Sequence, residues 1–338
     1  MVVRKSRTNR RDAGMCSGVL LALAVVASLA CAPAVVRAQD TYPSKPIRLI
    51  VPYPPGGVGD AVARMLVPGW SAGLKQPIVI ENRGGAGSNI GLDAVAKSAP
   101  DGYTIGLFDN ALVVNPSLYR SLPYDAQRDL APISVVARGP LVLVVNPSFP
   151  AKTVNELVAL AKAKPGSISY ASAGNGTPVH LAAEMLKSVA GIDMVHIPYK
   201  GAGPAITDVI GGQVPVLFAV PGTALQHINA GKLRPLAITG AVRFKLLADV
   251  PTFTEAGIQG VDGTIIVGFV VPSQTSPAVV SLLADTLVKA LASTEVTDKL
   301  AAFGLQVVGA SPERSKGMLA DETALWAKVV KSAGVKVE

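Results

Sequence analysis

The stretch VPYPPGGVGDAVAR, residues 51–64, places a cluster of prolines and glycines between an apolar run and a helical pattern. Glycine lets the backbone approach a ligand closely, and the first turn of a helix offers unpaired N–H groups and a positive dipole end. Residues in this order are suited to binding an anion such as a carboxylate. A tight strand-to-helix turn without a ligand explains the same residues, so this stretch alone leaves both interpretations open.

Three more segments combine the end of a strand-like run with a turn and a helical pattern. They are the residues after Phe108, the segment SAGNGTPVH and the segment YKGAGP. In open α/β sheets, ligands bind outside the carboxyl ends of the strands, where such turns gather. Four anion-suited loops are harder to explain as coincidental turns than one. We therefore predict a ligand site built mainly from backbone N–H donors.

Signatures of catalysis are scarce in this sequence. It contains no G-x-x-x-x-G-K-[ST] and no H-E-x-x-H. The stretch GWSAG, residues 69–73, matches G-x-S-x-G, but it lies within the helical pattern from Gly59 to Leu74 and not at a strand-to-helix turn, so it is not a nucleophile elbow. The stretch GAGSNIG, residues 85–91, has one residue too many for G-x-G-x-x-G, and we interpret it as a packed strand-to-helix turn. His180, His196 and His227 lie on separate predicted elements, and only His180 follows an anion-suited loop closely. We predict no catalytic residue, no cofactor and no metal.

The first 38 residues have the composition of a secretory signal peptide. A basic segment, residues 4–11, precedes the apolar run GVLLALAVVASLA, which is short for a membrane-spanning helix. Val36 and Ala38 supply the small residues of a cleavage site. We predict cleavage after Ala38 and a periplasmic location. A retained membrane anchor and lipidation at Cys31 are the alternatives.

Removal of this segment changes the charge balance. It carries six basic residues and one acidic residue, so the formal net charge falls from +8 to +3. The basic excess that would favour nucleic acid is thereby mostly lost. Both cysteines, Cys16 and Cys31, lie in the same segment, so the exported chain has no disulfide. A chain of about 300 residues is long enough for one large or two medium domains held by burial alone.

Strand-like and helix-like runs alternate along the exported chain. Apolar runs such as PIRLIVPY, YTIGLF, PLVLVV and VPVLFAV each precede a helical pattern or a proline-started helix. They are apolar at successive positions, as parallel strands covered on both faces require. A late strand, TIIVGFVVP from Thr264, reopens the pattern. We predict an α/β fold of two lobes, each a doubly wound, mostly parallel sheet, with the second lobe inserted into the first.

The lobe boundaries follow from this order. The chain is predicted to cross between lobes near Gly139–Pro140 and near Asp262–Gly263. The signal peptide then covers residues 1–38. The first lobe comprises residues 39–140 and 263–338, and the inserted second lobe comprises residues 141–262.

The succession of motifs resembles one family along essentially the whole exported chain. YPSKPIRLIVPYPPGGVGD is followed by ENRGGAGSNIG, PDGYTIGL, SYASAGNGTPVHLAAE, HIPYKGAGPAITDVIGGQV and LADVPTFTEAG. Together these segments are similar to the substrate-binding proteins of tripartite tricarboxylate transporters, the Bug-type periplasmic receptors. The resemblance implies a type II periplasmic-binding-protein fold, or Venus flytrap, that closes on a small carboxylated molecule and delivers it to a membrane permease.

The resemblance also implies that the PPGG loop and its partner in the other lobe hold a ligand carboxylate. In the first lobe the matching residues are Tyr53, Pro54, Gly56 and Gly57. In the second lobe they are Ser172, Ala173, Gly174, Gly176, Thr177, His180, Tyr199, Lys200, Gly201 and Asp208. Asp60 matches the family's acid after the glycines, which we interpret as shaping the start of the helix.

Two positions depart from the pattern of the family. After YTIGLF the family usually has small hydroxyl residues, whereas Asp109 and Asn110 stand here, and we include both in the predicted site. Ile265 and Ile266 occupy a region in which the family often has tryptophan. An ionised Asp109 that faces the cleft would repel a second carboxylate of the ligand. Three outcomes are open: a ligand with an ammonium or amide group near Asp109, a small monocarboxylate, or an Asp109 that turns away to cap the following segment.

The sequence therefore predicts a non-catalytic, monomeric receptor. Its expected ligand is a small organic acid of an open class, which includes di- and tricarboxylates, aromatic acids, amino acids and amides. Its expected partner is the permease of a tripartite tricarboxylate-type transporter, and nucleic acid is not expected. The alternatives are a ligand sensor for a signalling partner and a secreted hydrolase.

Overall fold

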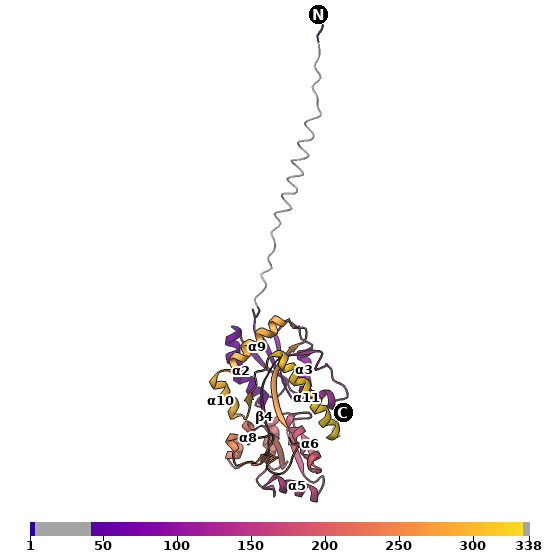
Figure 1. The fold of residues 1–338 in the computed structure, drawn as a ribbon, viewed down its shortest axis with the longest axis vertical. Helices are drawn as coiled ribbons and strands as arrows, with labels where there is room; N and C mark the ends of the chain where they lie inside the picture. The colour runs from indigo at the N-terminus through magenta and orange to yellow at the C-terminus, as the bar shows by residue number, and fades with distance from the viewer. Residues whose placement is uncertain (4–41, 262, 334–338) are drawn as a thin grey trace. The chain divides into compact units, whose positions relative to one another are not determined.

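A computed structural model of the chain describes residues 1–3, 42–261 and 263–333. The predicted signal peptide lies almost wholly outside the described residues, and so does Asp262 at one predicted lobe crossing. Tyr42–Glu338 forms one unit, and its described part contains two β-sheets covered by helices (Figure 1). In Figure 1, α2, α3 and α9 lie in the upper part of this unit and α5, α6 and α8 in the lower part, with β4 between them.

The first sheet has six strands in the order β11-β4-β10-β3-β1-β2. They are β1 (Ile47–Val51), β2 (Ile78–Asn82), β3 (Thr104–Asp109), β4 (Leu130–Pro140), β10 (Thr264–Pro272) and β11 (Gln306–Val307). The helices packed on it are α2 (Val58–Leu74), α3 (Asn89–Ala96), α4 (Ala111–Leu118), α9 (Pro277–Leu291), α10 (Thr294–Ala302) and α11 (Pro312–Ala333). We call this part the first lobe.

The second sheet has five strands in the order β7-β6-β8-β5-β9. They are β5 (Val142–Val145), β6 (Ser169–Ser172), β7 (Val195–Pro198), β8 (Val216–Ala219) and β9 (Arg234–Ile238). Its helices are α5 (Val154–Ala163), α6 (Pro178–Ala190), α7 (Ala202–Ile210) and α8 (Pro221–Asn229), with a short 3-10 turn, η1 (Lys245–Leu247). We call this part the second lobe.

The α/β two-lobe fold is confirmed, but both sheets are mixed where the sequence predicted mostly parallel pairing. In the first lobe β1 is parallel to β2 and β3, whereas β10 is antiparallel to β3 and β4. In the second lobe β6 is parallel to β7 and β8, whereas β5 is antiparallel to β8 and β9. β5 and β10 are buried at nearly every position. Helices on both faces of a sheet cause this burial whatever the direction of the strand.

The chain leaves the first sheet at the end of β4 and returns to it at β10. The Thr239 hydroxyl forms hydrogen bonds to both segments that connect the two sheets. The Leu141 N–H donates to Thr239 Oγ1 at 2.7 Å, and the Thr239 hydroxyl donates to the Gly263 carbonyl at 2.5 Å. Thr239 is completely buried. The connection between the sheets is therefore held by hydrogen bonds as well as by packing.

Several helices begin at residues that are suited to a helix start. Thr153 Oγ1 accepts a hydrogen bond from the Glu156 N–H at 3.2 Å, which caps α5. Proline occupies the first position of α6, α8 and α9. The C-terminal helix α11 packs against α4 of the first lobe and α6 of the second. Among the described residues, no helix is both long and apolar enough to cross a membrane.

Candidate functional site

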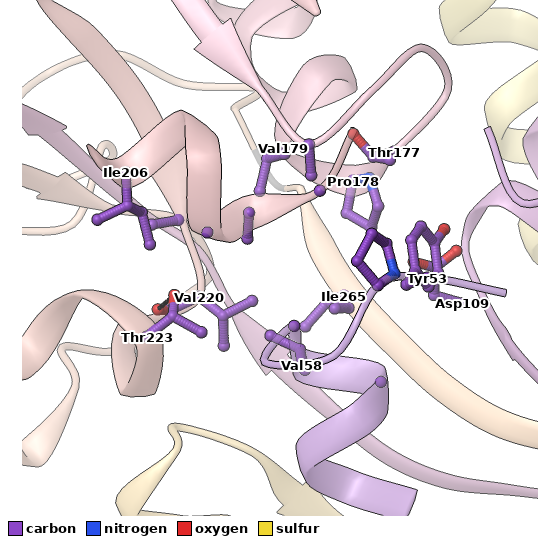
Figure 2. A pocket seen from close by; sticks show the side chains of 18 of the residues that line it. Tyr53, Val58, Asp109, Thr177, Pro178, Val179, Ile206, Val220, Thr223 and Ile265 are labelled. Atoms are coloured by element: carbon purple, nitrogen blue, oxygen red, sulfur yellow. Dashed lines mark hydrogen bonds between the residues drawn. The ribbon is translucent and has the colours of Figure 1, made fainter. Parts of the chain in front are cut away.

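A partly open cavity lies between loops of the two lobes (Figure 2). Its volume is about 80 Å³, enough for several water molecules or a small part of a ligand. Its wall is formed by residues 53–55, 57–59, 109, 173, 177–179, 201–204, 206, 217–220, 223 and 265. Most of these residues are apolar or glycine. A mainly apolar wall with a few polar groups is typical of small-molecule sites.

Four helices begin at this cavity. Their N-cap residues are Gly57 for α2, Thr177 for α6, Gly201 for α7 and Val220 for α8. First-turn N–H groups have no partner within their helix and lie at the positive end of its dipole. In α8 these groups already donate to the carbonyls of Val220 and Phe303, so α8 contributes its dipole alone. The N–H donors facing the cavity therefore come from α2, α6 and α7.

Asp60 holds the loop that precedes α2. Its carboxylate accepts hydrogen bonds from the Gly56 N–H at 3.0 Å, Arg64 Nε at 2.9 Å and Asn82 Nδ2 at 3.0 Å. Although burial raises it, these bonds hold the pKa of Asp60 below its usual value. Gly56 has a φ of +88°, a conformation that favours glycine, whereas Gly57 has an ordinary φ of −78°. The interpretation that Asp60 shapes the start of the helix is confirmed.

Asp109 is the one wall residue with a side chain that ionises near neutral pH. It ends β3, and its Oδ1 accepts a hydrogen bond from the Ala111 N–H at 2.9 Å. Burial raises the pKa of Asp109 to about 6. The Tyr53 and Ser88 hydroxyls are buried beside it without the geometry of a hydrogen bond to any group. Asp109 thus bonds to the start of α4 with one oxygen and also lies on the wall of the cavity, while its effect on a ligand stays a prediction.

Comparison with known proteins identifies the family. Residues 62–335 match the model of the tripartite tricarboxylate transporter family receptor. The chain belongs to this family. Protein BugT of Bordetella pertussis is 40% identical over 301 residues, which cover 88% of this chain and 92% of BugT. Members of the family are transporter receptors, that is, binding proteins and not enzymes, so the hydrolase alternative is excluded.

Solved structures of receptors extend the similarity to the fold. Rpa4515 of R. palustris, determined with adipate, has a TM-score of 0.84 and 33% identity, covering 87% of this chain and 99% of its own. MatC of Rhodopseudomonas palustris, determined with bound malate, has a TM-score of 0.81 and 28% identity, covering 86% of this chain and 100% of its own. The fold of this chain is therefore that of a two-lobe periplasmic binding protein.

The structure brings the four loops predicted from the sequence of this receptor to one cavity. Seven of the sixteen predicted site residues lie on its wall, namely Tyr53, Pro54, Gly57, Asp109, Ala173, Thr177 and Gly201. The other nine are outside the wall, namely Gly56, Asn110, Ser172, Gly174, Gly176, His180, Tyr199, Lys200 and Asp208. A direct contact between the ligand and any of the seven remains a prediction.

The predicted polar residues outside the wall are mostly bonded to their own surroundings. The Asn110 side chain donates to the Thr264 carbonyl at 3.0 Å and accepts from the Ile266 N–H at 2.8 Å, so it fastens α4 to β10. The Asp208 carboxylate accepts the Tyr199 hydroxyl at 2.6 Å. Each of these groups already has the partner that a ligand would otherwise supply.

His180 belongs to a buried polar cluster behind the SAGNGTP loop. Its Nδ1 accepts the Gly176 N–H at 3.1 Å, and its ring stacks on His196 with centroids 4.0 Å apart. The His196 ring is hydrogen-bonded to Ser172 Oγ at 2.6 Å. Burial lowers the pKa of His180 to about 4, so the ring is neutral at neutral pH. These side chains support the loop from behind the wall of the cavity, and a direct contact of His180 or Ser172 with the ligand stays a prediction.

Thr177 is on the wall but does not cap α6 with its side chain. Its hydroxyl donates to the Gly174 carbonyl at 2.7 Å, so that hydrogen is not available to a ligand. The sequence analysis also missed a fifth loop, the start of α8, which adds Val220 and Thr223 to the wall. The apolar run VPVLFAV before PGTAL was its signal, since this is another strand followed by a proline-started helix.

Proposed function

We propose that this protein is an extracytoplasmic receptor that captures a small carboxylated molecule in the cavity and delivers it to a tripartite tricarboxylate-type transporter. The observation that carries the proposal is the convergence of four helix N-termini on one cavity. The described wall offers no lysine, arginine or histidine. A bound carboxylate is therefore compensated by N–H groups and helix dipoles, each dipole contributing about 0.3–1 kcal/mol. Adipate and malate, the ligands of the two similar receptors, are both carboxylates.

We further propose that the lobes open to admit the ligand and close over it. The lobes are residues 39–140 with 263–338, and residues 141–262. Their loops are in contact beside the cavity, since a Cβ added to Gly87 would lie 2.6 Å from the backbone oxygen of Asn175. Separation of these two loops would widen the path by which a ligand reaches the cavity.

The chain is proposed to be exported and to begin at Gln39 after cleavage. This follows from the basic segment, the apolar run and the small residues at Val36 and Ala38. The intact mass of the protein recovered from the periplasm tests the cleavage site. A mass that corresponds to lipidation at Cys31 would overturn this assignment.

A thermal-shift screen tests the receptor function. The panel contains mono-, di- and tricarboxylates, aromatic acids, amino acids and amides, each beside the alcohol that lacks its carboxylate. A ligand at 100 times its Kd stabilises the folded state by about 2.7 kcal/mol. Small-angle scattering should show a smaller radius of gyration with that ligand. If no carboxylate stabilises the protein more than its alcohol does, the proposal fails.

Delivery to the transporter is tested separately from binding. The ligand-loaded receptor is added to proteoliposomes that contain the cognate permease, and uptake of the labelled ligand is followed. Uptake supports the transport role. Binding without uptake, together with capture by the periplasmic domain of a sensor kinase, would favour the signalling alternative.

A further inference from the structure

One end of the cavity is polar and has no cationic side chain. Figure 2 shows Tyr53 and Asp109 together on one side of the pocket, with Ile206, Val220 and Thr223 across from them. The ends of the wall thus differ in chemistry. The Tyr53 side carries a carboxyl and a phenol, whereas the far side is apolar apart from one hydroxyl.

The groups at the polar end are buried and incompletely paired. Asp109 uses Oδ1 for the Ala111 N–H at 2.9 Å, and no lysine, arginine or histidine in the described chain is bonded to its carboxyl. The Tyr53 and Ser88 hydroxyls are buried without a hydrogen bond of full geometry, and the Tyr53 hydroxyl interacts with the Asp109 carboxyl and with Ser88. Because buried polar groups of native proteins are nearly always paired, this end of the cavity has hydrogen-bonding capacity left for a bound molecule.

The titratable groups near Asp109 do not supply a positive charge either. Tyr53 follows β1 and Tyr124 follows α4, and both interact with the Asp109 carboxyl. Burial raises the pKa of Tyr53 well above its usual value, so its hydroxyl remains protonated. An ionised Asp109 is therefore stabilised by the Ala111 N–H at the start of α4 and by Tyr53, but by no cationic side chain among the described residues.

We propose that the ligand of this receptor is a monocarboxylate that also carries a nitrogen hydrogen-bond donor, an ammonium or an amide, which faces Asp109. The inference rests on the proposed function, which assigns the carboxylate to the helix N-termini. A second carboxylate at the polar end would meet a like charge with no cation between them. An N–H donor of the ligand would instead find the Asp109 carboxylate as its acceptor. The Tyr53 and Ser88 hydroxyls would then bond to the ligand or to a water molecule bound beside it.

The test uses sets of ligands matched in chain length, from succinate to adipate. Each set contains the dicarboxylate, its monoamide, the ω-amino acid and the unsubstituted monocarboxylate, and Kd is measured by calorimetry at pH 7.5. At the best chain length we expect the amide or the ω-amino acid to bind at least tenfold more tightly than the dicarboxylate, about 1.4 kcal/mol. A dicarboxylate that binds more tightly than both would overturn the inference.

Asp109→Asn links the preference to this residue. The amide oxygen still accepts the Ala111 N–H, while the charge is removed, so the preference should shrink at least tenfold. Asp101→Asn is the matched control, because Asp101 lies at the other end of β3 and accepts the Tyr103 N–H at 3.0 Å in the same kind of turn. An unchanged preference in Asp109→Asn, or an equal change in Asp101→Asn, contradicts the role of Asp109.

The pH dependence of the unmodified protein gives a readout that needs no variant. Because the pKa of Asp109 is about 6, an ω-amino acid should bind about fourfold more weakly at pH 5.5 than at pH 7.5. A dicarboxylate should instead bind more tightly at pH 5.5, after correction for its own titration, and an amide should change least. The size of the change thus distinguishes ammonium from amide. Equal pH dependence for all ligands overturns the inference, whereas failure of every carboxylate to bind overturns the proposed function itself.

Discussion

Substitution of Gly87 by alanine should prevent full closure of the lobes. Gly87 lies in the loop between β2 and α3 and has a φ of +59°. An added Cβ would lie 2.6 Å from the Asn175 backbone oxygen and 2.8 Å from the Tyr119 hydroxyl. Tyr119 is the end of a flexible side chain and moves at little cost. Asn175 belongs to the facing loop of the second lobe, so its backbone must retreat.

The size of the effect follows from this overlap. Forcing an extra carbon into a packed contact costs about 1–3 kcal/mol. Separation of the lobes relieves the contact, so the cost falls on the closed state alone and appears as about 5- to 150-fold weaker binding. The left-handed φ costs a further 1–2 kcal/mol or so for alanine, but it does so in the open and closed states alike. That second cost lowers stability and leaves affinity unchanged.

Gly191→Ala separates these two costs. Gly191 has a φ of +61°, and a Cβ there would meet no atom within 4 Å. Urea unfolding should show similar losses of stability for both variants, and calorimetry with the best ligand should show weaker binding for Gly87→Ala alone. Wild-type affinity in Gly87→Ala would refute the reasoning, because the lobes would then not meet at this loop in the bound state. An equal loss of affinity in both variants would assign the effect to general destabilisation.

Three further predictions concern the frame of the site. Asp60→Asn should lower the free energy of unfolding by about 2 kcal/mol and weaken ligand binding. The reason is that the Gly56 N–H and the side chains of Arg64 and Asn82 lose a charged acceptor. An unchanged urea midpoint would show that water replaces those bonds. Thr239→Val should lower the free energy of unfolding by about 1–3 kcal/mol, because the buried Leu141 N–H loses its acceptor. Thr239→Ser should retain most of the stability, and an equal loss in both variants would contradict this role of the hydroxyl. Burial lowers the pKa of His180 to about 4 and that of His196 to about 3, so the folded state binds fewer protons than the unfolded state below about pH 6.5. Stability should decline from pH 6.5 toward pH 4, with each ring contributing up to about 1.4 kcal/mol per pH unit, and His180→Phe should reduce this slope.

The two-lobe fold was predictable from the sequence because each local signal agrees with the architecture. Apolar runs end in turns, and the next helices begin at residues such as Pro178 and Pro221, which are suited to the first helical position. The direction of β5 and β10 was not predictable in the same way. Both strands are apolar on both faces, as helix-covered strands are, and their direction is set by pairing with strands distant in the sequence. The local sequence pattern does not determine which distant strands pair, or in which direction.

The loops of the site were also predictable, but the orientation of their side chains was not. Asn110, Thr177 and His180 were all included in the predicted site. Each of them forms a hydrogen bond to a nearby backbone group, and Thr177 alone of the three also lies on the wall. Short polar side chains compete for the local backbone whenever a turn leaves groups unpaired, and sequence does not show which competitor is favoured. Asp109 also bonds to the local backbone, but it uses only Oδ1 for the Ala111 N–H.

The charges on the wall explain why the ligand class could not be read from composition. A sequence search for an anion site looks for lysine, arginine or histidine, and the described wall has none of them. Its favourable potential comes from helix N-termini, which any sequence can form provided that the turn before the helix has the right shape. Gly56 provides that shape through its positive φ, and Asp60 fixes it. If the proposed function is right, the groups that bind the carboxylate occur in any similar turn. In the proposal, selectivity then depends on Asp109, the one acidic side chain on the described wall.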